Sequence, residues 1–422
     1  MNQVGSLHGL GVICGLAAAP WLAGAEAPTK LVMTGLSPFL ISLAMVAGVF
    51  VARWTLPTAL KGTGYIFTDL RQRPHLIIWA VLAGCLWAVG NTLTVFAVGE
   101  VGLSIAFPLW NVNSLVGVFW GWLFFRELRG GGLGNLAKVV GGAVAILAGA
   151  VALGYASSHE SAMVPHRAFA GIVAAIGAGL MFGTMYIPYR KAYLSGMNPI
   201  SFVTVFTVGE MITMPTLAIA FSGGVGPLIA ELSLARPSLF WLFLGGFCWV
   251  VGDLFQNYAA KYIGIGRGIP LSNTNQLWGL AWGALVFFEF AGVGRSALTL
   301  VLAGSMIMIL GAAAISSAAA PEGEQISTQE AIARECERYD LSFESAAASQ
   351  RGEDIIAGEA PAHRWWDGLI IAGAAGIFLW LGRYARVPLI HMNSAWAILL
   401  VGLMLLFLFG SGWILWKKTR FS

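Results

Sequence analysis

The chain has 422 residues, of which 58% are hydrophobic and only 10% are charged. Soluble domains carry about 25% charged residues. This composition, together with a mean hydropathy of +0.77, therefore excludes an ordinary soluble protein and indicates one that crosses a membrane many times. A net charge of +4 is too small to suggest a nucleic acid partner.

Twelve apolar stretches follow one another along the chain. A helix needs about 20 mostly apolar residues to cross a bilayer core of ~30 Å. No Lys or Arg precedes the first stretch, as a signal peptide would require, so we interpret all twelve as membrane spans. They cover residues 6–24, 30–52, 76–99, 103–125, 135–156, 168–189, 199–222, 238–260, 265–287, 297–318, 366–383 and 394–416.

Lys and Arg predict the orientation of these spans. If the N-terminus is cytoplasmic and the spans alternate, 18 of the 24 Lys and Arg residues fall in cytoplasmic segments, among them Arg53, and six fall in outer segments. Because cytoplasmic loops are enriched in positive charge, we expect a multi-pass protein of the cell (inner or plasma) membrane with both termini in the cytoplasm.

One stretch of sequence occurs twice. Residues 89–127 and 251–289 align without a gap at an offset of 162 and agree at 15 of 39 positions. Fixed-period similarity is the signature of a duplicated unit. The unit holds five spans, an odd number, so the second copy is expected to be inverted in the membrane. Shared positions that apolar composition alone would not align are Pro108 and Pro270, Asn111 and Asn273, Trp120 and Trp282, and Glu127 and Glu289.

The duplication divides the chain into four parts. We expect residues 1–156 and 168–318 to form two inverted five-helix repeats. Residues 319–364 are predicted to be an acidic hydrophilic linker, solvated in one interpretation and regulatory or partner-binding in the other. Residues 365–422 are predicted to add two transmembrane helices and a basic tail. The expected fold is an all-α integral membrane protein with a ten-helix core and two extra C-terminal transmembrane helices.

Two segments of the second repeat carry a family resemblance. Residues 252–257 read GDLFQN, and residues 269–279 read IPLSNTNQLWG. With ten spans in two units of five, this pattern resembles the drug/metabolite transporter superfamily, in the branch that holds glucose/ribose porters, the rhamnose–proton symporter and ureide permeases. The resemblance covers residues 1–318 and implies solute transport without fixing the solute.

Two acidic residues lie inside predicted spans. Glu210 is at the centre of the stretch 199–222, and Asp253 lies within 238–260. An unpaired charge in hydrocarbon costs at least ~2.5 kcal/mol, so an ionisable residue there is a functional candidate. We predict that Asp253 first, and Glu210 second, couples proton uptake to transport. The alternative is a protonated carboxyl that hydrogen-bonds a neighbouring helix.

Aromatic and amide side chains share one helix face in each repeat. Trp249, Gln256 and Asn257 fall at helical spacing in one span, and Trp87 and Asn91 in another. Such a face could stack on a sugar ring or a planar ureide and bind its polar edge. The alternative is hydrogen bonding between helices, worth about 0.6–2 kcal/mol per bond.

A second set of candidates lies near the centres of the stretches 103–125 and 265–287. We predict that its amides and indoles face the solute, or that the amides satisfy carbonyls freed by the preceding prolines. Glu127 and Glu289 close the same two helices and are predicted to be interfacial or gating residues. The set is Trp110, Asn111, Asn113, Asn273, Asn275, Gln276 and Trp278.

The sequence thus predicts a secondary transporter that moves a small polar metabolite, a sugar in the first place, by alternating access, with a proton as the candidate coupling ion. The alternatives are a ureide, nucleobase or drug carrier, working as importer or exporter, and a channel or membrane scaffold. No nucleophile or metal motif indicates an enzyme, and no cofactor or metal is expected. The expected partners are the solute and membrane lipid. Glycine runs at 141–154 and 304–311 suit close helix packing, either within the fold or between the protomers of a homodimer.

Overall fold

The computed structural model describes residues 2–32, 35–101, 106, 109–128, 132–157, 165–288, 294–318, 322–356, 363–386 and 392–422. Within these ranges the regular structure is helical throughout. Ten of the described helices are long and apolar enough to cross a membrane, so the predicted all-α membrane fold is confirmed. They are α1 (Asn2–Gly24, continued by α2, Glu26–Val32), α3 (Pro38–Gln72), α4 (Leu76–Val101), α7 (Gly132–Ser157), α8 (Pro165–Leu194), α9 (Pro199–Phe221), α11 (Leu239–Ile263), α14 (Arg295–Ser316), α17 (Trp365–Tyr384) and α18 (Ser394–Thr419).

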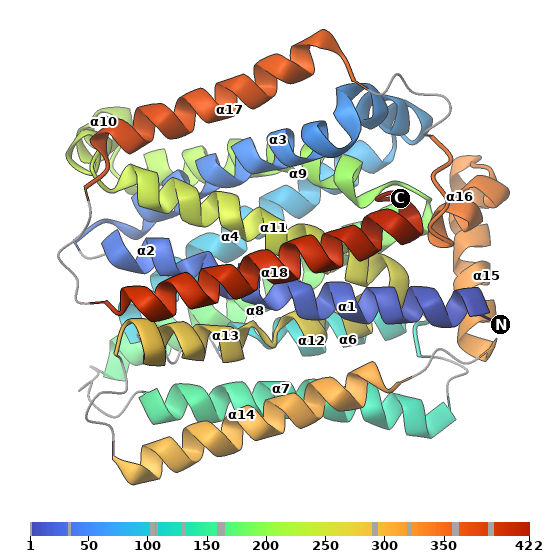
Figure 1. The fold of residues 1–422 in the computed structure, drawn as a ribbon, viewed down its shortest axis with the longest axis horizontal. Helices are drawn as coiled ribbons and strands as arrows, with labels where there is room; N and C mark the ends of the chain where they lie inside the picture. Colours follow the sequence, from blue (N-terminus) through green and yellow to red (C-terminus); the bar gives the residue numbers. More distant parts are fainter. Residues whose placement is uncertain are drawn as a thin grey trace.

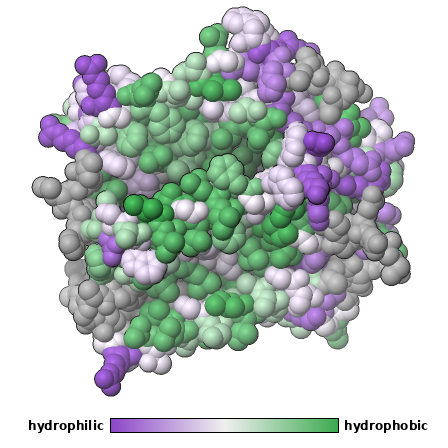
Figure 2. Space-filling view, in the orientation of Figure 1, coloured by the Kyte–Doolittle hydropathy of each residue, from purple (hydrophilic) through white to green (hydrophobic). Residues whose placement is uncertain are grey.

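The long helices run side by side across the molecule (Figure 1). Two linker helices, α15 (Glu322–Tyr339) and α16 (Phe343–Gln350), lie at one end of the bundle, where α1 begins and α18 ends. We call this end the linker end. The short helix α10 (Val225–Leu234) lies at the opposite end. Hydrophobic residues cover the middle of the face shown in Figure 2, and hydrophilic residues gather toward the linker end.

Two predicted spans are not continuous helices. In the stretch 103–125, α6 (Asn113–Phe125) begins only after a turn at residues 111–112. In the stretch 265–287, α12 (Ile265–Ser272) ends at a turn at residues 273–274, and α13 (Asn275–Ala281) and a π-helical turn (Trp282–Val286) follow. The two turns are 162 residues apart, at equivalent positions of the repeated stretch. Pro108 lies outside the described residues.

Helix packing in the two halves follows one pattern. α1 packs on α11 as α8 packs on α4, and α3 packs on α11 as α9 packs on α4. The last two contacts depend on paired glycines. A Cβ on Gly48 or Gly246 would collide with a backbone carbonyl of the facing helix, and the same holds for Gly84 and Gly209. Gly84 and Gly246 are again 162 residues apart.

The glycine runs are used within the chain. In the pair α7–α14, Gly142 faces the backbone of Gly311, and Gly149 faces that of Gly304. At an offset of 162, Gly304 is the counterpart of Gly142, and Gly311 is the counterpart of Gly149. The contact of Gly142 with Gly311 is therefore equivalent to the contact of Gly304 with Gly149. Small residues let helix backbones approach closely in membranes, and here they do so between the two predicted repeats.

Helix α3 breaks at Gly62, whose φ of 79° lies outside the helical range. The break leaves amide groups of the following turn without helical partners. The carboxylate of Asp367, in the first turn of α17, accepts from the Thr63 amide at 3.2 Å and from its hydroxyl at 2.5 Å. The indole of Trp366 also donates to the Thr63 hydroxyl, at 2.7 Å. One of the two extra helices thus caps a break in the core.

Candidate functional site

Three fully buried charges meet where α3, α9 and α11 pack together. One guanidinium nitrogen of Arg53 lies 2.9 Å from Oε1 of Glu210, and the other lies 2.7 Å from Oδ2 of Asp253. All three side chains have no exposed surface. Charge-assisted hydrogen bonds of this kind are short and strong, and burying charges is tolerable only when they are paired in this way. We call these residues the central triad.

Arg53 was missed as a site residue and was wrongly assigned to a cytoplasmic segment. The predicted span 30–52 ended just before it, whereas α3 runs from Pro38 to Gln72 and carries Arg53 in its interior. A signal was nevertheless present. Two acids placed inside spans call for a buried cation, and Arg53 is flanked on both sides by apolar residues.

Aromatic rings enclose the guanidinium of Arg53. It lies 4.0 Å from the ring centre of Phe206 and 5.6 Å from that of Trp249. Trp249 in turn packs against Trp87, with ring centres 5.1 Å apart. Cation–π contacts of this kind gain strength when water is excluded. The two tryptophans are 162 residues apart, so equivalent positions of the two predicted repeats meet beside the triad.

The triad carries a net charge of −1 when all three groups are ionised, since one guanidinium faces two carboxylates. One oxygen of each acid, Oε2 of Glu210 and Oδ1 of Asp253, is buried and has no hydrogen-bond partner among the described residues. An isolated net charge in a low-dielectric interior is costly. One proton, or one monovalent cation held by these oxygens, would make the triad neutral.

Hydrogen bonds lead from the triad toward the linker end. The side-chain amide of Asn257 donates to the backbone carbonyl of Asp253 at 2.7 Å. The hydroxyl of Tyr193 donates to Oδ1 of Asn257, and the backbone carbonyl of Tyr193 accepts from Gln350 of α16 at 2.8 Å. On the other side, Gln256 donates to the Ser272 hydroxyl at 2.7 Å, which ties α11 to the broken helix α12.

The two broken helices meet through amides near their breaks. The Asn273 side chain donates to Oδ1 of Asn113 at 2.7 Å and to the Ser114 hydroxyl at 2.5 Å. The described hydrogen bonds of this pair thus run from side chain to side chain between the halves, not to carbonyls freed by proline. All three side chains are buried.

The remaining candidates are spread around these two centres. Asn91 and Asn111 are buried, and each has a side-chain nitrogen without a partner among the described residues, as does Gln276. Oδ1 of Asn275 is also buried without a hydrogen-bond partner among the described residues. Trp110 is half-buried.

Trp278 packs edge-on against Phe407 of α18, with ring centres 5.6 Å apart. The described ring contact of Trp278 is therefore with α18 and not with the triad. Glu289 lies outside the described residues. No three His, Cys, Asp or Glu side chains in the part of the chain that is described come close enough to hold a metal ion.

Glu127 lies in a buried ion pair toward the linker end. Its carboxylate is 2.8 Å from Nε of Arg190 and accepts from the amides of Ile265 and Gly266 at 3.2 and 2.9 Å. Anions are favoured at helix N-termini because the first amides lack helical partners. Glu127 therefore holds the start of α12 against α6 and α8.

Comparisons with known proteins give a partial likeness. No family model matches the chain. Two relatives from Streptococcus pyogenes, of serotypes M1 and M3, each named "Putative sugar uptake protein", are 35% identical to it over 108 residues. Each match covers 23% of this chain and 37% of the relative's length. A solved crystal structure is similar over 72% of this chain and 95% of its own, at 16% identity and a TM-score of 0.43, a likeness too low to carry an argument.

Proposed function

We propose that this membrane protein is a secondary transporter that takes up a small polar solute, a sugar in the first place, by alternating access. The names of the relatives favour a sugar. The equivalent turns at residues 111–112 and 273–274 and the exchangeable glycine contacts support two inverted repeats. Inverted repeats with broken helices are typical of secondary transporters, whose sites lie at the repeat interface near the midplane.

The solute is proposed to bind beside the packed pair of Trp87 and Trp249. Flat aromatic surfaces stack on the apolar faces of sugar rings, and neighbouring amides bind hydroxyl groups. Two asparagines supply such amides. Asn91 follows Trp87 by one helical turn, and Asn257 follows Trp249 by two turns. In the state described here, all four side chains are buried or half-buried, as expected of a closed conformation.

The central triad is proposed to bind one proton in each transport cycle. The observation that carries this proposal is its composition of one buried cation, two buried acids and two carboxylate oxygens without a partner in the described residues. Arg53 stays charged at any physiological pH, so the proton must reside on Asp253 or Glu210. Asp253 comes first because its counterpart at the offset of 162 is Asn91, which cannot titrate.

The orientation proposed from the charge count places the linker end in the cytoplasm. In that arrangement the ion pairs of Glu127 and of the linker helices lie at the inner side. Glu127 is then proposed to close the inner side of α12, while the corresponding role of Glu289 stays a prediction. The triad lies in the span interiors between the two surfaces.

Uptake by purified protein in liposomes tests the proposal. An inward proton gradient is imposed, and accumulation of labelled hexoses, pentoses and deoxyhexoses is measured, with ureides and nucleobases as parallel arms. Accumulation of a sugar above equilibrium that collapses when an ionophore removes the gradient supports the proposal. Accumulation driven by Na⁺ would assign the same oxygens to a metal cation. Uptake of only a ureide or nucleobase would replace the sugar.

A further inference from the structure

We infer that residues 343–356 form a gate that closes the linker end of the solute path, and that residues 419–422 wedge this gate in place. The inference rests on the proposed transport function for the path itself, and on described contacts for the gate. We call residues 343–356 the gate segment and residues 419–422 the tail segment.

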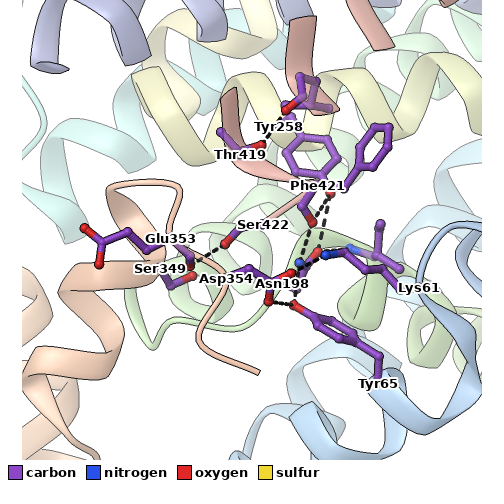
Figure 3. A network of polar contacts seen from close by, with 12 residues as sticks. Lys61, Tyr65, Asn198, Tyr258, Ser349, Glu353, Asp354, Thr419, Phe421 and Ser422 are labelled. Carbon is purple, nitrogen blue, oxygen red and sulfur yellow. Dashed lines mark hydrogen bonds and ion pairs between the residues drawn. The ribbon is translucent and has the colours of Figure 1, made fainter. Parts of the chain in front are cut away.

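The gate segment binds two of the three helices that carry the triad, α3 and α11. Asp354 forms an ion pair with Lys61 of α3 and accepts from the Tyr65 hydroxyl at 3.1 Å. The hydroxyl of Ser349 accepts from Lys261 of α11 at 3.1 Å. These contacts are drawn in part in Figure 3. Within residues 343–356, these contacts thus hold part of the acidic linker against the helix bundle.

The gate segment also lies against α8 and against the turn that leads from α8 into α9. Gln350 donates to the backbone carbonyl of Tyr193 at 2.8 Å. Gly196, between the two helices, lies so close to Ala346 that a Cβ added to it would come within 2.9 Å of the Ala346 backbone. The gate segment thus contacts α3, α8, α11 and the turn between α8 and α9.

The tail segment lies between the gate segment, the start of α9 and α11. The backbone carbonyl of Phe421 accepts from Asn198 at 2.7 Å and from the Tyr258 hydroxyl at 3.0 Å. Ser422 accepts from the Tyr262 hydroxyl at 2.7 Å and donates its own hydroxyl to the carbonyl of Glu353, also at 2.7 Å. Figure 3 shows the two segments converging on Asn198 and Tyr65.

The distance between the triad and the gate segment suits a gate at one end of the solute path. Lys61 follows Arg53 by eight residues, and Lys261 follows Asp253 by eight, which is about 12 Å along each helix. The Lys261 side chain is almost wholly buried, although a lone ammonium prefers water. Since its described hydrogen bond is to Ser349, displacement of the gate would expose a cationic vestibule two helical turns below the triad.

The neighbouring helix α15 fixes the position of the gate. Lys191 of α8 pairs with Glu335 at 2.5 Å, and the ring of His75 stacks on Tyr339 with centres 3.9 Å apart. Partial burial, aided by Lys191, lowers the pKa of His75, so its ring is neutral against Tyr339 at neutral pH. α15 is therefore anchored beside the gate segment.

Thiol labelling of Ser201→Cys in a variant without native cysteines tests the gate. Ser201 is fully buried on α9, one turn inside Asn198. With the protein in nanodiscs, an impermeant thiol reagent should modify this cysteine slowly. Asp354→Asn should raise the rate about tenfold by favouring local opening, and Lys61→Met should act likewise. Exchanging the charges, Lys61→Asp with Asp354→Lys, should restore slow labelling.

Matched controls decide the outcome. Glu344→Gln removes an exposed acid of the same gate segment and should leave the rate unchanged. Thr29→Cys, in α2 at the other end of the bundle (Figure 1), should stay slow in every variant. Equal rates for Asp354→Asn and Glu344→Gln would overturn the gate, as would a parallel rise at Thr29→Cys. Because labelling needs no solute, it tests the gate independently of the sugar uptake assay.

Discussion

Asp253 accepts from the guanidinium of Arg53 at 2.7 Å, while the residue at the equivalent position of the first predicted repeat is Asn91. The duplication thus keeps a polar side chain at this depth in both halves and an acid in only one. A structural hydrogen bond could be made by an amide in either half, but only the acid can exchange a proton. This asymmetry makes Asp253 the first residue to change.

We predict that Asp253→Asn uncouples transport without abolishing it. The substitution leaves Arg53 paired with Glu210, so the buried group is neutral without a bound proton. Solute exchange at equal concentrations should survive, and accumulation under a pH gradient should fall to the equilibrium level. Counterflow and gradient-driven uptake in the same liposomes measure the two quantities. If the variant still accumulates solute, Glu210→Gln is the next variant to test.

We predict that Trp249→Ala and Asn257→Ala weaken solute binding while the protein still inserts and folds. Trp249 supplies a ring at the interface of the halves, and Asn257 connects the Asp253 backbone to Tyr193. Loss of one stacking or hydrogen-bonding partner should weaken binding about tenfold or more. Isothermal titration with the transported solute measures it. Normal affinity in both variants would assign these residues to packing.

The orientation predicts that α16 is cytoplasmic. Ser349 is buried under the bundle, so a cysteine at the exposed Glu344 is the better probe. In intact cells that express the Glu344→Cys variant without native cysteines, an impermeant thiol reagent should fail to label it until the membrane is permeabilised. Strong labelling from outside would invert the topology and, with it, the side on which the gate opens.

The glycine contacts between the halves predict a selective loss of stability. Gly246→Ala places a Cβ against the carbonyl of Met45, in a helix crossing with no room for it. Overpacking of this kind costs about 1–3 kcal/mol. Gly279→Ala, at a helical position with nothing within 4 Å of the added Cβ, is the matched control. Thermal unfolding in detergent should separate the two, and equal midpoints would contradict the close approach.

The sequence was sufficient for the features that depend on local pattern. Apolar length located the ten long helices, and the offset of 162 identified the repeated stretch. The breaks at residues 111–112 and 273–274 were not predicted, and neither was the packing of Trp87 on Trp249. Features that depend on tertiary contacts were not accessible in this way. Arg53 was assigned to a loop because its partners, Glu210 and Asp253, lie on other helices that are distant in sequence. Likewise, the acidic linker looks solvated by composition, because its partners Lys61 and Lys261 are distant in sequence.

Arg53 provides the most demanding prediction, because it is buried with both acids. Arg53→Met leaves two unpaired carboxyls in the interior, which should destabilise the fold by about 3–5 kcal/mol, whereas replacing a whole buried ionic group by neutral residues is often tolerated. The triple variant Arg53→Met, Glu210→Gln, Asp253→Asn should therefore regain much of the thermal stability that Arg53→Met loses. It should nevertheless show no accumulation under a pH gradient, since no titratable group remains in the triad. Recovery of stability without recovery of accumulation would separate the structural from the coupling role of these residues. A triple variant that still concentrates the solute would place proton coupling elsewhere in the protein.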